Sequence, residues 1–201
     1  MSSEHFDVVV IGGGPGGYAA ALYGASAGLN IALIEKHKLG GTCLNVGCIP
    51  AKELLETAAV ARTVAHAGDF GVGAEVKSLD WATTLGRKQG IVDQLVGGLG
   101  GLLKGRKVTV YDGTGTLDGD HRTVRVSGGS SGDVAITGDN VVLAAGSVPR
   151  ALDGFPVDDR RILTSDEFLS IPELPGTAIV IGGGAIGCEF ASTVVPRSAM
   201  V

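Results

Sequence analysis

The feature that most constrains the fold is the opening stretch FDVVVIGGGPGGYAAALYGASAGLNIALIEK. Its apolar run at residues 6–11 ends at glycine, which is typical of a strand buried on both faces. A GxGxxG motif at residues 12–17 follows this strand and opens an alanine-rich helix that we expect to end near Ala27. A second apolar strand at residues 30–34 ends in Glu35. Strand, glycine turn, helix, strand and acid in this order predict a dinucleotide-binding βαβ unit.

Each residue of this motif has a physical task. Gly12 would make the tight turn, Gly14 would let the backbone approach a pyrophosphate, and Gly17 would let the helix lie close to the strand. The N-terminus of the helix would present free N–H groups and its positive dipole to the phosphates. Glu35 could accept hydrogen bonds from ribose hydroxyls. The alternative is a glycine-rich turn that binds no ligand.

Composition and charge exclude several classes of protein. A chain of 201 residues with a net charge of −5 and no long basic cluster argues against binding to nucleic acid. No apolar run approaches the roughly 18 residues of a membrane span, and the run at residues 8–11 is too short for a signal peptide core. Three cysteines are too few for a secreted disulfide framework. We therefore expect a soluble cytoplasmic protein with no nucleic-acid or membrane partner.

The middle of the chain predicts two helices and a group of short strands. The helices are expected at residues 50–67 and, despite several glycines, at residues 79–104. Turn clusters separate the strands, and those between residues 115 and 136 would form a small antiparallel meander. The expected strands cover residues 107–110, 115–117, 123–126, 134–136 and 141–145.

A second copy of the opening plan starts about 170 residues after the first. The sequence AIVIGGGAIGCEFASTVV predicts a strand at residues 178–181, a glycine turn at residues 182–187 and a helix that Pro196 should end. No returning strand and no acid about 20 positions on follow this unit. We therefore predict an α/β protein with a dinucleotide-binding domain at residues 1–150 and an incomplete second dinucleotide-binding domain at residues 151–201.

The stretch GGTCLNVGCIPAK places Cys43 and Cys48 close together. A zinc site is disfavoured because no second Cys/His pair follows at a suitable distance, so we expect no metal. Five residues of straight helix rise about 7.5 Å, which exceeds the roughly 7 Å that a disulfide allows between Cα atoms. Gly47 makes a distortion of the helix plausible. A bridge here would close a very small loop, which suits opening and closing better than a structural crosslink.

With its order of motifs, this stretch resembles the redox-active segment of the flavoprotein disulfide reductases. Leu44 and Ile49 make it most similar to the dihydrolipoyl dehydrogenase branch, and the resemblance runs from residue 6 to about residue 194. Two positions depart from the family pattern. Ala51 stands where serine is usual and Ala145 where threonine is usual, so each loses a hydroxyl and a hydrogen bond of about 0.5–1.5 kcal/mol.

The resemblance implies roles for four residues. Cys43 and Cys48 would form the disulfide beside the flavin, with Cys48 on the flavin side and Cys43 exchanging with the dithiol substrate. Lys52 would lie near the flavin and pair with Glu189. The resemblance makes residues 1–150 an FAD-binding domain and residues 151–201 an incomplete NAD(P)-binding domain. The implied FAD contacts are Gly12, Gly14, Pro15, Gly17, Glu35, Lys36, Gly41, Thr42, Lys52, Gly115, Ala145, Gly146 and Ser147. The implied start of the NAD site comprises Gly182, Gly184, Ala185, Ile186 and Gly187.

The resemblance also implies an activity: electrons would pass from dihydrolipoamide, carried by the lipoyl domain of a 2-oxoacid dehydrogenase complex, through the disulfide and FAD to NAD+. Family members form homodimers, are more than twice as long, and complete each active site with a His–Glu dyad from the partner subunit. We therefore expect the 201-residue chain to be a fragment that is inactive alone. Two alternatives stay open: a non-catalytic FAD-binding module, and a reductase of the same family for glutathione or mercuric ion.

Overall fold

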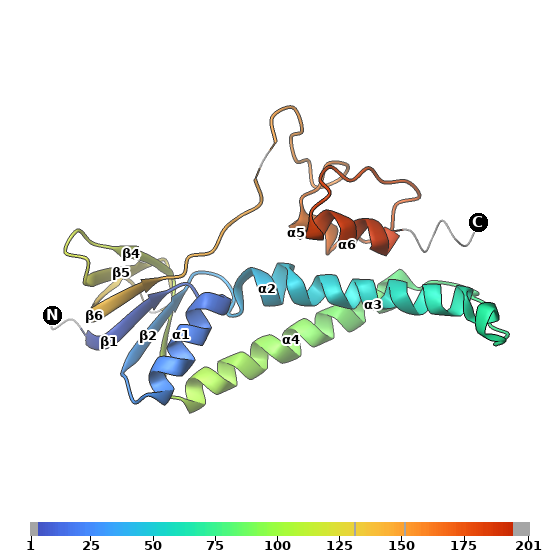
Figure 1. Cartoon of the computed structure of the whole chain (residues 1–201). Helices are drawn as coiled ribbons and strands as arrows, with labels where there is room; N and C mark the ends of the chain where they lie inside the picture. Colours follow the sequence, from blue (N-terminus) through green and yellow to red (C-terminus); the bar gives the residue numbers. More distant parts are fainter. Residues whose placement is uncertain (1–3, 131, 151, 195–201) are drawn as a thin grey trace. The chain divides into compact units, whose positions relative to one another are not determined.

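The computed structural model describes residues 4–130, 132–150 and 152–194 (Figure 1). The chain divides into two compact units, each made of two separate segments. Unit 1 holds the described residues of Met1–Asn45 and Asp93–Val148. Unit 2 holds those of Val46–Val92 and Pro149–Val201. The predicted domain boundary at residue 150 stays a prediction, because a compact unit need not be an independently folding domain.

Unit 1 is built on a six-stranded sheet with the order β3-β2-β1-β6-β5-β4. The strands β3, β2, β1 and β6 run parallel to one another, whereas β5 pairs antiparallel with both β4 and β6. The predicted α/β fold with a parallel sheet and an antiparallel meander is therefore confirmed. The strand bounds are β1 Glu4–Ile11, β2 Ile31–Glu35, β3 Thr109–Asp112, β4 Thr114–Leu117, β5 Thr123–Ser127 and β6 Val134–Leu143.

The core of unit 1 lies on both faces of β1, as the continuous apolar run predicted. Val9 and Val10 point to opposite faces, and both are 0% exposed. Val9 packs with the strands of the meander, whereas Val10 packs with helix α1 (Pro15–Ser26) and the later part of helix α4 (Trp81–Gly105). Figure 1 shows α1 beside this sheet.

One prediction about the sheet is wrong. Residues 134–136 and 141–145 were expected to form separate strands. The residues Gly138, Asp139 and Asn140 between them do favour a turn locally. The structure joins them into the single strand β6, which ends at Leu143. The parallel ladder with β1 runs past this segment on one side, and it keeps the backbone extended where local preference would bend it.

Unit 2 is helical. It contains α3 (Cys48–Ala65), the first part of α4, a 3₁₀ turn at Ala67–Phe70, α5 (Ser165–Phe168) and α6 (Ala185–Val194). Its core gathers Leu54 of α3, Trp81 of α4 and Leu169, with Phe190 of α6 packed against them. The segment after α5 is held by two hydrogen bonds from α4: Trp81 Nε1 donates to the carbonyl of Ile171, and Lys88 Nζ to that of Leu169, each at 2.9 Å.

The strand predicted at residues 178–181 does not form. These residues have no regular secondary structure, and the side chain of Ile179 is 90% exposed. A strand needs a neighbour to bond its backbone groups, and the described part of unit 2 contains no strand. Pro196, predicted to end the following helix, lies outside the described residues. Among the described helices, none is both long and apolar enough to cross a membrane.

Candidate functional site

The first glycine turn connects β1 to α1 and needs glycine for steric reasons. Gly12 has φ +105°, and a Cβ there would collide with the carbonyl of Ala144 beside the end of β6. A Cβ on Gly17 would collide with the carbonyl oxygen of Gly12. The predicted tight turn and the close approach of helix to strand are therefore confirmed.

The N-terminus of α1 is suited to a phosphate. Gly14 caps the helix without a side-chain hydrogen bond, and Pro15 occupies the first helical position. No acidic residue lies in the first turn, so the positive end of the helix dipole faces no carboxylate of its own helix. N–H groups without a side-chain cap and a first turn without an acid suit the binding of a pyrophosphate.

Glu35 ends β2 and ties it to the glycine turn. Its Oε2 accepts a hydrogen bond from the backbone N–H of Gly13 at 2.7 Å, and its Oε1 accepts one from the N–H of His37 at 2.8 Å. A carboxylate has lone pairs for further bonds, so these contacts leave the predicted bond to a ribose open. Lys36, the next residue, is exposed.

The start of the cysteine stretch lies against the glycine turn within unit 1. The N–H of Gly40 donates to the carbonyl of Gly13 at 2.8 Å. A Cβ on Gly41 would come within 2.6 Å of the Cα of Gly14, so the two backbones touch. Helix α2 (Gly41–Val46) begins here and carries the half-buried Cys43. Thr42 is exposed at its start.

The distortion predicted at Gly47 is confirmed. Helix α2 ends at Val46 and α3 begins at Cys48, because Gly47 takes non-helical angles of φ −145° and ψ −118°. Cys43 and Cys48 are therefore on separate helices, and Cys48 is exposed. The helix predicted from residue 50 begins two residues earlier. The disulfide between the two cysteines and their separate roles stay predictions.

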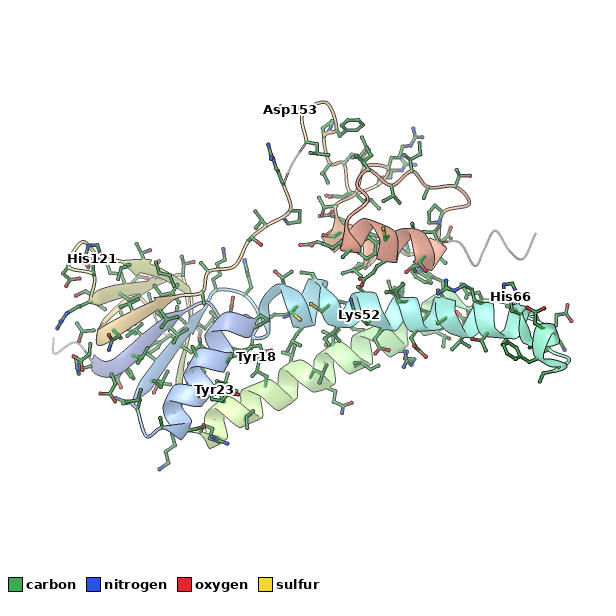
Figure 2. All side chains as sticks on the ribbon, viewed as in Figure 1. Tyr18, Tyr23, Lys52, His66, His121 and Asp153 are labelled. Carbon is green, nitrogen blue, oxygen red and sulfur yellow. The ribbon has the colours of Figure 1, made fainter. Side chains whose placement is uncertain are left out.

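In unit 2 the predicted pairing of Lys52 with Glu189 is confirmed. Lys52 Nζ donates to Glu189 Oε1 at 2.5 Å, joining α3 to α6 across 137 positions of sequence (Lys52 is labelled in Figure 2). The Lys52 side chain is 60% exposed and that of Glu189 27%. An ion pair this exposed contributes at most about 1 kcal/mol to stability. The pair therefore matters less for stability than for fixing the positions of the Lys52 ammonium and the Glu189 carboxylate.

Two further contacts hold α6 within unit 2, one to α3 and one to α5. Arg62 Nη1 donates to the carbonyl of Ser192 at 2.9 Å, which places a cation at the C-terminal end of α6. Phe168 and Phe190 stack with ring centroids 4.3 Å apart. Neither contact was predicted from the sequence, because each joins residues that are distant along the chain and carry no motif.

The second glycine turn repeats the first in its backbone. Gly182 has φ +117°, and a Cβ on Gly187 would collide with the carbonyl of Gly182. Gly184, Ala185 and Ile186 are exposed at the start of α6. Their predicted contacts with NAD stay predictions.

The remaining predicted FAD residues lie around the sheet of unit 1. Gly115 of β4 is pressed against its core, since a Cβ there would be 3.2 Å from Ile11 and 3.3 Å from Ile34. Ala145, Gly146 and Ser147 follow the carboxyl end of β6 and are exposed. Ligands of open α/β sheets bind at such strand ends.

Comparisons with known proteins agree with this geometry. The model of the pyridine nucleotide-disulphide oxidoreductases matches residues 6–199. This chain belongs to that family. Among its relatives, dihydrolipoyl dehydrogenases from Chlamydia trachomatis and Bacillus subtilis are each 45% identical over 200 residues, covering 94% and 96% of this chain. The chain spans only 41% and 42% of the length of these two relatives.

A solved structure shares the fold. It is the Cu(II) complex of the HOCl-induced flavoprotein disulfide reductase RclA from Escherichia coli, with a TM-score of 0.78 and 28% identity. The match covers 98% of this chain and 41% of that one. Membership of the pyridine nucleotide-disulphide oxidoreductases implies FAD and NAD(H) as cofactors. The first turn, where only glycine fits at positions 12 and 17, and the N-terminus of α1, which has no side-chain cap, fit the dinucleotide FAD.

Proposed function

We propose that the chain carries the FAD-binding and dithiol-exchange part of a dihydrolipoyl dehydrogenase. The observation that supports this most is the contact between the cysteine stretch and the glycine turn in unit 1. Gly40 bonds to Gly13 and the backbone of Gly41 touches that of Gly14, so the helix of Cys43 begins on the dinucleotide turn. A thiol segment that starts on a dinucleotide turn is well placed for electron transfer between its thiols and a dinucleotide bound at that turn.

The proposed exchange begins from a Cys43–Cys48 disulfide. One thiolate of dihydrolipoamide attacks Cys43 Sγ, forming a mixed disulfide and releasing Cys48 as a thiolate. The second thiolate of the substrate then attacks the substrate's first sulfur, which is bonded to Cys43 in the mixed disulfide. This attack closes the lipoamide ring and releases Cys43 as a thiolate. The substrate loses two electrons and two protons, and the cysteine pair is reduced by the same two electrons. FAD, when bound, supplies the two-electron acceptor for this dithiol, and NAD+ is the final acceptor.

The chain's own residues would hold the cofactor and the charges around it. Gly12, Gly14 and Gly17 allow the close approach to α1, and Glu35 would accept from the ribose. Lys52, neutralised in part by Glu189, would place a cation near the reacting centre. Lipoyl-domain binding, homodimer formation and a cytoplasmic location belong to this proposal as predictions.

The exchange step can be tested without any flavin. The purified chain is oxidised, treated with dihydrolipoamide and alkylated, and the labelled cysteines are located by mass spectrometry. We expect Cys43 and Cys48 to become labelled together, whereas Cys43→Ser and Cys48→Ser variants form no reducible pair. Cys188→Ser is the matched control, because it removes the remaining thiol and should leave the exchange unchanged.

The same assay separates the alternatives. A chain that binds FAD but exchanges with no dithiol would be a non-catalytic flavin module, and our proposal would be wrong. Faster reduction by glutathione than by dihydrolipoamide, or binding of mercuric ion by the reduced pair, would favour the corresponding reductases.

A further inference from the structure

One amide side chain in the cysteine stretch has no role in the proposed function. Asn45 lies in α2, half-buried, two positions after Cys43. Its Nδ2 donates two hydrogen bonds, one to the carbonyl of Leu39 at 3.0 Å and one to the carbonyl of Gly41 at 2.9 Å. A single side chain therefore holds the backbone on both sides of Gly40.

The backbone that Asn45 holds is the part that touches the glycine turn. Between its two acceptors, the N–H of Gly40 donates to the carbonyl of Gly13 at 2.8 Å. The second acceptor residue, Gly41, has its backbone against Gly14. All of these groups belong to unit 1, so the contacts run without a break from Asn45 to the turn.

This loop needs hydrogen bonds from a side chain outside it, because its two glycines leave its backbone conformationally free. Gly40 and Gly41 have φ +95° and +54°, a region that glycine enters freely and from which it also departs freely. An asparagine amide offers two N–H donors on a short side chain, which a serine hydroxyl or an aspartate carboxylate cannot match. The donor count, rather than the volume of the side chain, is therefore what the position requires.

We propose that Asn45 is a positioning residue that sets the place of Cys43 relative to the dinucleotide turn. It acts by fixing the loop from which α2 begins, through its hydrogen bonds to the carbonyls of Leu39 and Gly41. The inference deepens the proposed function and rests on it only in so far as Cys43 is the exchanging thiol. The effect on the loop itself follows from the hydrogen bonds alone.

A graded series of variants tests the donor count. Asn45→Asp keeps the size and removes both donors, and it places a carboxylate against two carbonyl oxygens. Asn45→Ser keeps one donor, which can reach the carbonyl four residues back, at Gly41. Asn45→Ala removes donors and volume together. Asn30→Asp is the matched control, because Asn30 Nδ2 also donates to a backbone carbonyl, that of His5 at 3.1 Å.

Two readouts report on the loop. The first is the dissociation constant for FAD, measured by flavin fluorescence. The second is the alkylation rate of Cys43 in the reduced chain relative to Cys188, which cancels any global unfolding. For Asn45→Asp we expect about tenfold weaker FAD binding and a several-fold higher ratio of Cys43 to Cys188 alkylation. The reason is that each lost hydrogen bond changes an equilibrium constant by a factor of roughly two to ten. Asn45→Ser should lie between it and the original chain, and Asn30→Asp should change neither readout.

The order of the variants decides the matter. If Asn45→Asp matches the original chain while Asn45→Ala is impaired, side-chain volume matters and the proposal is wrong. Unchanged readouts in all three variants would also overturn it. If the chain is not reduced by dihydrolipoamide, the proposed function fails, whereas the ratio of Cys43 to Cys188 labelling still decides the role of Asn45.

Discussion

The two glycine turns of the chain have the same backbone and very different surroundings. Gly12 and Gly182 have φ +105° and +117°, and in each turn the third glycine lies against the carbonyl of the first. In unit 1, β1 leads into the turn between β2 and β6. In unit 2, the residues before the turn form no strand, and nothing lies within 4 Å of a Cβ placed on Gly182.

This difference between the two units shows that the glycine turn and the strand before it form for separate reasons. Both turns form although their surroundings differ, because the shape of each depends on contacts within six residues. The strand forms only where neighbours accept and donate its backbone hydrogen bonds. Four sets of variants test this difference between the two turns.

The largest contrast is expected between Gly12→Ala and Gly182→Ala. Both variants place a Cβ at positive φ, but only at Gly12 does that Cβ also meet the backbone of Ala144. We expect Gly12→Ala to lower the free energy of unfolding of unit 1 by about 4 kcal/mol and Gly182→Ala to lower that of unit 2 by about 1 kcal/mol. Native-state hydrogen exchange, read separately for amides of β1 and α6, measures each value. Equal losses would mean that the surroundings do not matter.

A smaller contrast is expected between Gly17→Ala and Gly187→Ala. In both variants the new Cβ meets the carbonyl of the first glycine of the same turn. The sheet prevents the first turn from relaxing, so we expect about 3 kcal/mol there and about 1 kcal/mol in the second turn. Exchange protection in α1 and α6 reports the two costs. A larger cost in α6 would contradict the comparison.

The ion pair that joins α6 to α3 should add little stability to the second turn. A double-mutant cycle with Lys52→Met and Glu189→Gln is expected to give a coupling of about 0.5 kcal/mol, because Lys52 is 60% exposed. Urea unfolding at low and high salt measures the coupling, which salt should weaken. A coupling of several kcal/mol would mean that the pair, rather than apolar packing, holds α6 in place.

The last prediction concerns the pH dependence of unit 2. Burial lowers the pKa of Lys88, whose ammonium group donates to the carbonyl of Leu169. Between this lowered pKa and the ordinary value of 10.5, the unfolded state binds more protons than the folded state, so stability should rise with pH there. Lys88→Met should flatten this slope in exchange measurements on α3, while amides of β1 serve as the control. A slope that survives in Lys88→Met would assign the effect to another group.

Much of the fold was predictable because its signals are local. The run that forms β1, the glycine turn and the helix behind it all depend on periodicity and on φ preferences within about six residues. The joining of β6 was missed for the opposite reason. Gly138 and Asn140 favour a turn locally, and only the ladder with β1 keeps them extended.

The site divides in the same way. The glycines and Glu35 were found from spacing, and the pairing of Lys52 with Glu189 was found from a family resemblance, because 137 positions separate the two residues. Asn45 was overlooked although it lies in the quoted cysteine stretch. Its donors serve carbonyls of a loop whose path depends on the glycine turn, and a sequence shows no such path.

Local sequence is enough to specify both glycine turns, because steric limits on φ act within a few residues and favour glycine at these positions. Which apolar run becomes a strand depends on tertiary contacts. Val10 and Val180 hold the same place in their motifs and lie 3.3 Å and 3.2 Å from a Cβ on the third glycine, yet only Val10 is part of a sheet. A backbone ladder needs neighbouring strands, and β1 has two: β2, which follows it closely, and β6, which comes from a distant part of the chain.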